Sequence, residues 1–557
     1  MYLIKENLSY SKTRIFSLIV IIALISLGIK LYTTNFDVLP PEDTFGYVLR
    51  AISHNNGDFT EPARKTLGWS IIISPFLNFV NSDNFLDYVG VAKILSISIS
   101  VISIYPMYLL ARRFFNEKYS LVAAFLFAVE PHLNQNAGLG LSEPLFILIS
   151  MLAVYFVLSK NPKFVYVSFL LIGLLWWIRF NGIVMIPIIS IIFFLNFKPS
   201  RSFKPSRSLL LKFFFGLSIL LLVVSPMLIH KYEQYGDPLY FSQSSTIYTG
   251  EYATIAAENT KSLNYSAFDY IDEHGLIQFI DKFILGGMYN LLDQTFKLSF
   301  PYLMMLLPFG ILFSFRAFDQ DSKYIRANWI IILITLGSFV TYFAVLQDRR
   351  LIFNILPFLI IFAVIPIQRL VEYGLSTFSF SKYRKNLSLL LILGIILLLA
   401  VSFTLRYELP NDVESNEKIE LSQYLFNNYG GNILDAGNTL QGLHYVKITN
   451  PPGIFKQYVM EKDVNSSENN ELTQINLYSK SLNDFILTSE KYDLKYIVIN
   501  KKGVTTEWYP FLDDLYDDDI HYPYLKIILD SNQLGFKNLK VKVFEIDYEL
   551  FHEFISN

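Results

Sequence analysis

The sequence predicts a multi-pass α-helical membrane protein that ends in a small α/β domain. Of its 557 residues, 52% are hydrophobic and only 17% are charged, whereas soluble domains average about a quarter charged residues. Apolar runs long enough to cross a bilayer recur up to residue 406. Beyond that residue the apolar density falls, and short β-type runs alternate with helix-like stretches.

Eleven apolar runs are expected to form membrane-spanning helices within a domain that covers residues 1–406. The first run, "IFSLIVIIALISLGIKLY", is too long for the core of a signal peptide and no small-residue cleavage site follows it. We therefore expect it to remain as a signal anchor. The third, fifth and sixth runs are short for a bilayer. The expected helices are residues 15–33, 89–110, 119–130, 143–159, 164–178, 182–197, 208–230, 298–315, 328–346, 351–368 and 387–406.

The distribution of positive charge predicts which side of the membrane each loop faces. If the N-terminus is cytoplasmic, the cytoplasmic links hold more than twice as many Lys and Arg residues as the outer loops, in about half the length. This orientation places the long loops 34–88 and 231–297 outside, together with the C-terminal residues 407–557. Both long loops are rich in Asp, Glu and Tyr. We therefore expect a cell-membrane protein whose chemistry lies on the outer face.

Residues 407–557 are expected to form an extracytoplasmic α/β domain. Helix-like stretches such as "EKIELSQYLFNNYG" lie between the β-type runs, and no Gly-rich phosphate loop is present in the sequence. The expected strands are "GNILDAGN", "KYIVIN", "LKIILDS" and "LKVKVFEID".

Charge and cysteine content exclude several functions. The net charge of −2 argues against nucleic acid as a partner, because phosphate binding needs a basic face. The chain contains no cysteine, which excludes disulfides, thiolate metal sites and cysteine nucleophiles. No motif requires a divalent cation, and none rules one out.

The carboxylates Glu42 and Asp43 lie in "PPEDTFGYVLRA", shortly after the first apolar run. Asp43, Tyr47 and Ala51 would share one face of a short amphipathic helix along the membrane surface. Asp43 could then deprotonate an acceptor hydroxyl at the boundary between water and lipid. The alternative is a solvated loop or a helix N-cap after Pro41.

Glu143, in "GLGLSEPLF", begins the fourth expected helix on the outer side. Ser142, Glu143 and Pro144 make a good helix start, so a purely structural role is one interpretation. The other is that Glu143 faces the same cavity as Asp43. Glu130 and His132 end the preceding helix on that side, and a metal site there lacks supporting ligand spacing.

Four basic residues near the outer edge are candidates for binding a phosphate. Each could simply extend its charged end to the membrane surface. Together they could form a cationic seat at the outer leaflet, where Arg is suited to bidentate contacts. The four residues are Lys93, Arg179, Arg349 and Arg350.

These features together resemble the glycosyltransferase C superfamily. The resemblance covers most of residues 14–406 and is greatest to the protein O-mannosyltransferase and aminoarabinose transferase branch. It rests on the Asp-x-x-x-Tyr of the first outer loop and on three segments further along the chain. These are residues 98–156, "GLLWWIRFNGIVMIPI" (173–188) and "DRRLIFNILPFLI" (348–360).

The resemblance implies an inverting transfer of sugar, outside the membrane, from a polyprenyl-phosphate donor to a protein, lipid or glycan acceptor. It assigns Asp43 as the catalytic carboxylate, Glu143 to the Ser-Glu-Pro segment, and Arg349 or Arg350 to the basic residue before a late helix. Here the acidic pair is Glu-Asp rather than the Asp-Glu of mannosyltransferases, so Glu42 also remains a candidate. The tail lacks the Trp-Trp-Asp of oligosaccharyltransferases, which argues against transfer of a whole glycan to asparagine.

Two other classes of protein fit part of the pattern. A transporter or lipid flippase also needs many helices and a few charges at membrane level. It would place ionisable residues near the bilayer midplane and balance its loops on both faces. A membrane protein that presents its tail as a binding module is the third interpretation.

Overall fold

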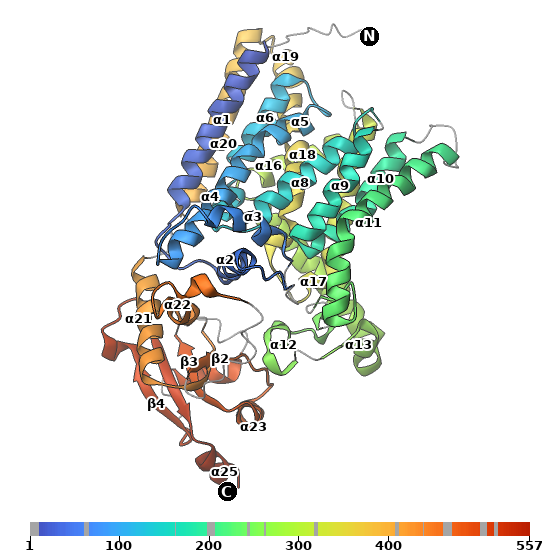
Figure 1. Ribbon diagram of the computed structural model, residues 1–557. Helices are drawn as coiled ribbons and strands as arrows, with labels where there is room; N and C mark the ends of the chain where they lie inside the picture. The colour runs from blue at the N-terminus through green and yellow to red at the C-terminus, as the bar shows by residue number, and fades with distance from the viewer. Residues whose placement is uncertain are drawn as a thin grey trace.

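The computed structural model describes residues 11–60, 66–161, 163–197, 206–241, 246–260, 263–316, 321–406, 412–437, 439–459, 471–501, 509–516 and 522–556. Long helices form one part of the molecule, and a sheet domain lies at one end of them (Figure 1). The predicted fold class, a multi-pass helical membrane protein with a C-terminal α/β domain, is confirmed.

Each of the eleven predicted apolar runs forms helix. The second run is divided between two helices, with a break at Ser103. The helices are α1 (Lys12–Thr33), α4 (Phe85–Ile102) with α5 (Ile104–Ala111), α6 (Glu117–Ala128), α8 (Glu143–Val157), α9 (Lys163–Ile178), α10 (Met185–Phe197), α11 (Arg207–Tyr235), α16 (Leu303–Ser314), α17 (Ser322–Phe343), α18 (Leu356–Arg369) and α20 (Lys382–Arg406).

The number of membrane crossings remains a prediction. Within the described ranges, seven helical stretches are long and apolar enough to cross a membrane by themselves. An eighth results if Leu276–Ser299 and Leu303–Ser314, bent by 111°, form one span. Helices α8 and α9 have 15 and 16 residues. At about 1.5 Å per residue they are shorter than a hydrocarbon core of about 30 Å.

Helix α2 (Glu42–Asn55) is the amphipathic helix expected in the first long loop. Its first turn contains two carboxylates, which the positive end of the helix dipole stabilises. One face buries Val48, Ala51 and Ile52 against the helical part. Figure 1 shows α2 between the long helices and the C-terminal domain.

Several short helices connect the long ones and were not expected from the sequence. Prolines, glycines and polar residues interrupt their apolar pattern, so no run reaches membrane-spanning length. They are α3 (Gly68–Leu77), α7 (Pro131–Ala137), α12 (Tyr252–Ala256), α13 (Ala267–His274), α14 (Leu276–Phe279), α15 (Gly287–Ser299) and α19 (Leu375–Thr377).

The C-terminal domain contains a five-stranded sheet in the order β2-β1-β3-β5-β4. Strand β1 pairs in parallel with β2 and β3, whereas β5 pairs antiparallel with β3 and β4. The four predicted strands are confirmed, and only the three-residue β2 was missed. The strands are β1 (Gly431–Asp435), β2 (Leu472–Gln474), β3 (Leu494–Asn500), β4 (Leu525–Asp530) and β5 (Val541–Ile546).

Helices cover the sheet and link its strands. The predicted helix before β1 is present as α21, and residues 407–411, at the predicted domain boundary, lie outside the described residues. The helices of this domain are α21 (Asp412–Asn428), α22 (Gln441–Thr449), α23 (Leu482–Lys491) and α25 (Tyr548–Ser556).

Candidate active site

A cavity with a volume of about 1970 Å³ lies between the helical part and the C-terminal domain. Pockets for a single small ligand are typically about 300–1,000 Å³, so this one has room for two substrates at once. Its walls come from α2, the start of α8, the segment after α9, the end of α17 and the C-terminal domain.

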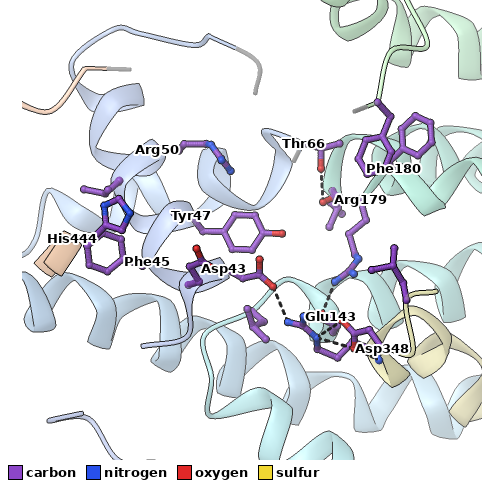
Figure 2. A pocket seen from close by; sticks show the side chains of 18 of the residues that line it. Asp43, Phe45, Tyr47, Arg50, Thr66, Glu143, Arg179, Phe180, Asp348 and His444 are labelled. Carbon is purple, nitrogen blue, oxygen red and sulfur yellow. Dashed lines mark hydrogen bonds and ion pairs between the residues drawn. The ribbon is translucent and has the colours of Figure 1, made fainter. Parts of the chain in front are cut away.

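Helix α2 presents one polar face to this cavity. Asp43, Tyr47 and Arg50 are spaced at i, i+4 and i+7, and all three line the cavity (Figure 2). Hydrogen bonds to other elements hold the helix in place. The Thr44 hydroxyl donates to the Leu139 carbonyl over 2.7 Å, and the Ser70 hydroxyl donates to the Tyr47 carbonyl over 3.0 Å.

The Asp43 carboxylate forms an ion pair with Arg350, with 2.8 Å between Oδ2 and Nη1. Arg350 also contacts Asp348, with 2.7 Å between Nη2 and Oδ2. Asp348 caps the 3₁₀ helix Arg349–Ile355 by accepting a hydrogen bond from the Arg350 amide. The side chains of Asp43 and Arg350 are 33% and 32% exposed, so the cavity gives access to both.

Glu143 and Arg179 form a second ion pair on the same side of the cavity (Figure 2). Glu143 is the first residue of α8 and is buried, and Arg179 follows α9 with an extended backbone. Arg179 also approaches the Ser142 hydroxyl, at 3.4 Å. Within the described part of the chain, Glu143 Oε2 is buried and accepts no hydrogen bond.

The structure brings most of the predicted site residues together. Five of them line the one cavity: Glu42, Asp43, Glu143, Arg179 and Arg350. Asp43 and Arg350, which contact each other, are 307 positions apart in the sequence. The expectation that Glu143 faces the same cavity as Asp43 therefore agrees with the geometry.

Lys93 and Arg349 are not among the cavity-lining residues. Lys93 is buried and its Nζ donates to the Asn35 carbonyl over 2.7 Å, so it braces the start of the first loop. Arg349 and Arg350 occupy a 3₁₀ helix with about three residues per turn, so adjacent side chains point about 120° apart. Of the four basic residues expected to form a cationic seat, Arg179 and Arg350 therefore border the cavity, and phosphate binding by any of the four remains a prediction.

Burial controls the ionisation of two side chains on α2. It raises the pKa of Tyr47, with Arg179 acting in the opposite direction, so the phenol stays protonated at neutral pH. The Tyr47 hydroxyl lies 3.5 Å from the Ser142 hydroxyl. Burial, with the nearby Arg50 cation, lowers the pKa of His54 to about 4, so His54 is neutral at pH 7.

No cluster of three or more His, Asp or Glu side chains that could hold a metal ion occurs in the described ranges. Glu130 instead caps α7 by accepting from the Leu133 amide, and its other oxygen lies 2.9 Å from His132 Nδ1. His132 packs on Phe403, away from the cavity lining.

Comparison with known proteins agrees with this architecture. Residues 88–230 match the family described as dolichyl-phosphate-mannose-protein mannosyltransferase. The search of curated protein sequences found no match. The apo structure of the oligosaccharyltransferase of Archaeoglobus fulgidus superimposes with a TM-score of 0.57 at 13% identity, over 88% of this chain and 70% of that one. The chain has the glycosyltransferase C fold.

Two further structures of the Archaeoglobus fulgidus enzyme match in the same way. The complex with zinc and sulfate has a TM-score of 0.57 at 13% identity, over 87% of this chain and 68% of that one. The complex with an inhibitory peptide and a dolichol-phosphate has a TM-score of 0.55 at 13% identity, over 88% and 69%. These likenesses agree with the resemblance seen in the sequence, and they show that the chain shares the fold of that enzyme.

The C-terminal domain supplies a wall of the cavity that the sequence did not predict. Most of these side chains are polar or aromatic, and they come from α22, β2 and the segment 454–459. No motif marks them in the sequence, and only their packing against α2 brings them to the site. They include His444, Lys447, Gln457, Tyr458 and Thr473.

The opposite side of the cavity is apolar. Phe180 and Phe241 stack with their ring centres 4.3 Å apart, and further apolar side chains lie on the segment after α9 and at the end of α17. They include Ile183, Val184, Phe339 and Val345. The cavity therefore combines an apolar side near spanning helices, a charged centre and a polar wall.

Proposed function

We propose that the protein transfers a sugar from a polyprenyl-phosphate donor to an acceptor hydroxyl, with inversion at the anomeric carbon and with Asp43 as general base. The observation that supports this most strongly is the Asp43–Arg350 ion pair inside a cavity large enough for two substrates. A carboxylate beside a fixed cation, reachable from the cavity, suits a base next to an anionic leaving group.

The apolar side of the cavity is the proposed site of the lipid-linked donor. The segment Phe180–Phe197 and the helix Ser322–Phe343 are both long and apolar enough to span a membrane. Ile183, Val184 and Phe339 lie on these elements and face the cavity. A polyprenyl chain could run between them while its phosphate lies near Arg350.

The chemistry of the transfer follows from this placement. Asp43 takes the proton of the acceptor hydroxyl as its oxygen bonds to the anomeric carbon. The bond from that carbon to the phosphate oxygen breaks, and the electron pair leaves with polyprenyl phosphate. Arg350 stabilises the negative charge that grows on that oxygen. Glu143 holds Arg179 in place as the second cation of the cavity.

The acceptor is proposed to enter from the C-terminal domain, where the cavity wall is polar. It is a protein, lipid or glycan with a free hydroxyl. The excess of basic residues in the predicted cytoplasmic links supports an extracytoplasmic position for this domain and a cytoplasmic N-terminus. Protease added to intact cells should then cut the C-terminal domain and spare the link between α10 and α11.

The role of Asp43 is tested by Asp43→Asn. This variant keeps the size of the side chain but removes the proton acceptor. General-base catalysis contributes about 10²- to 10⁴-fold, so kcat should fall by about that factor. Donor affinity should change little, because Arg350, the cation proposed to lie near the phosphate, keeps its ion pair with Asp348. The assay measures release of polyprenyl phosphate by purified protein.

Glu42→Gln is the matched control for Asp43→Asn. Glu42 also lines the cavity but is exposed, and adjacent helical positions point about 100° apart. The control should therefore keep near-normal kcat. An active Asp43→Asn with an inactive Glu42→Gln would move the base to Glu42, and full activity in both variants would contradict general-base catalysis from α2.

A further inference from the structure

We propose that residues 451–459 of the C-terminal domain form a clamp that positions α2, with Phe455 as its central positioning residue. The inference rests on the proposed function, because it concerns how Asp43 is aimed at the acceptor. The contacts that support it join α2 to the C-terminal domain, and Phe45 and Phe455 also line the cavity.

Phe455 is a C-terminal-domain residue buried within the hydrophobic core of the helical part. Its ring packs edge-on against Phe85 and Tyr88, with centroid distances of 5.4 and 5.1 Å. Phe85 in turn lies 4.8 Å from Phe45, which is two residues after Asp43 on α2. A continuous row of aromatic rings therefore joins the C-terminal domain, α4 and α2.

Hydrogen bonds from the C-terminal domain hold both ends of α2. At its C-terminal end, Asn56 Nδ2 donates to the carbonyls of Lys456 and Tyr458 over 3.0 and 3.1 Å. Before its N-terminal end, the Leu39 amide donates to the Ser415 hydroxyl over 3.1 Å. Lys456 adds an ion pair to Asp83, at 2.7 Å, just before α4.

The position of α2 determines where the Asp43 carboxylate points. Asp43, Tyr47 and Arg50 share one helix face, so a rotation or shift of α2 would move all three together. A misplacement of about 1 Å can lower a rate by about 10²-fold. The docked C-terminal domain is thus part of the catalytic unit.

The first test replaces Phe455 in the full-length protein. Phe455→Ala should lower kcat by about 10- to 100-fold while donor Kd stays within about twofold, because the donor site lies across the cavity. Phe455→Leu, which keeps apolar volume, should restore most of kcat. Phe554→Ala is the matched control, because Phe554 is half exposed on α25 and belongs only to the C-terminal domain.

The second test locks the clamp with an engineered disulfide. A Cβ at Gly453 would lie 3.9 Å from the Asp83 Cβ, within the range of about 3.5–4.5 Å for disulfides. The chain has no cysteine of its own, so within one chain the pair Asp83→Cys/Gly453→Cys can form only the intended bond. Gly453 has a φ of 78°, so the reduced double variant is the reference for strain.

The oxidised double variant should keep the kcat of its reduced form. When the same disulfide is added to Phe455→Ala, at least part of the lost kcat should return. Such a recovery would show that Phe455→Ala acts through the position of the clamp and not through a general loss of stability. Two results would overturn the clamp: unchanged kcat in Phe455→Ala, or an oxidised lock that is inactive until it is reduced. Wild-type protein in the same assay separates the two proposals, since an inactive wild type contradicts the proposed function itself.

Discussion

Two groups of charged and polar side chains in the helical part differ in whether a cavity reaches them. The cavity cluster consists of Asp43, Glu143, Arg179, Asp348 and Arg350, and it borders the large cavity. The sealed cluster consists of Ser26, Lys30, Glu130, His132 and Asn134. Asp43 and Arg350 are about one-third exposed, whereas Lys30 and Glu130 are each 1% exposed.

The sealed cluster joins helices instead of facing a ligand. Lys30 Nζ donates to the Ser26 hydroxyl over 2.6 Å and also to Asn134 Oδ1, which ties α1 to α7. An unpaired ammonium inside a membrane protein is costly, so these contacts are needed wherever Lys30 is buried. Access from a cavity therefore distinguishes the charged residues of the proposed reaction site from buried charges that join helices.

Arg350 should give the largest effect among the tests of this comparison. Arg350→Gln removes the cation proposed to contact the donor phosphate, and a hydrogen bond to a charged group contributes about 1.5–3 kcal/mol. Donor Kd should rise by about 10- to 100-fold, measured by titration of labelled donor. Arg349→Gln is the matched control and should leave Kd within about twofold. Equal Kd values in wild type and Arg350→Gln would place the phosphate elsewhere.

Lys30→Met should affect stability and leave the chemistry intact. The variant keeps the length of the side chain but leaves Asn134 Oδ1 without its donor, at a cost of about 1–3 kcal/mol in the free energy of unfolding. The kcat of the folded fraction should match that of wild type. A fall in kcat without a fall in Tm would indicate that the sealed cluster takes part in catalysis. It would then contradict the distinction between the two clusters.

His54 should give the smallest effect, as a loss of stability in acid. Because burial lowers the pKa of His54 to about 4 from 6.5, the unfolded chain takes up the proton first as the pH falls. Stability from this group is present above pH 6.5 and is lost toward pH 4. Between pH 7 and pH 5.5 the loss should be about 1 kcal/mol.

Thermal unfolding at several pH values measures the contribution of His54. His54→Phe retains a ring that can stack on Phe59 and does not titrate in this range. The pH dependence of Tm should therefore be shallower in His54→Phe than in wild type. If Tm depends on pH in the same way in both proteins, His54 takes up its proton equally in the folded and unfolded states.

The sequence predicted what depends on local pattern. Apolar runs predicted the long helices, and short β-type runs predicted four of the five strands that the structure describes. The side of the membrane assigned to each loop was enough to group Asp43, Glu143, Arg179 and Arg350, since all four fall at the same end of the helices. Family resemblance then singled out Asp43 within its loop.

The features that the sequence did not predict share a physical cause. Hydropathy gives the depth of a residue along a helix but not the direction in which its side chain points, so it did not reveal that Arg350 lines the cavity whereas Lys93 and Arg349 do not. The wall from the C-terminal domain depends on contacts between distant residues, such as Asn56 with Lys456, 400 positions apart. Such contacts leave no signal in a single sequence.

The most direct test of the central claim is the consumption of donor by purified wild-type protein. Protein in lipid nanodiscs is mixed with radiolabelled polyprenyl-phosphate sugars, one at a time, together with membrane extract as the source of acceptor. If the protein is the proposed glycosyltransferase, at least one donor is consumed and polyprenyl phosphate is released. The transferred sugar then has the inverted anomeric configuration. Movement of an intact donor across the bilayer without cleavage of the sugar–phosphate bond would contradict the proposed function.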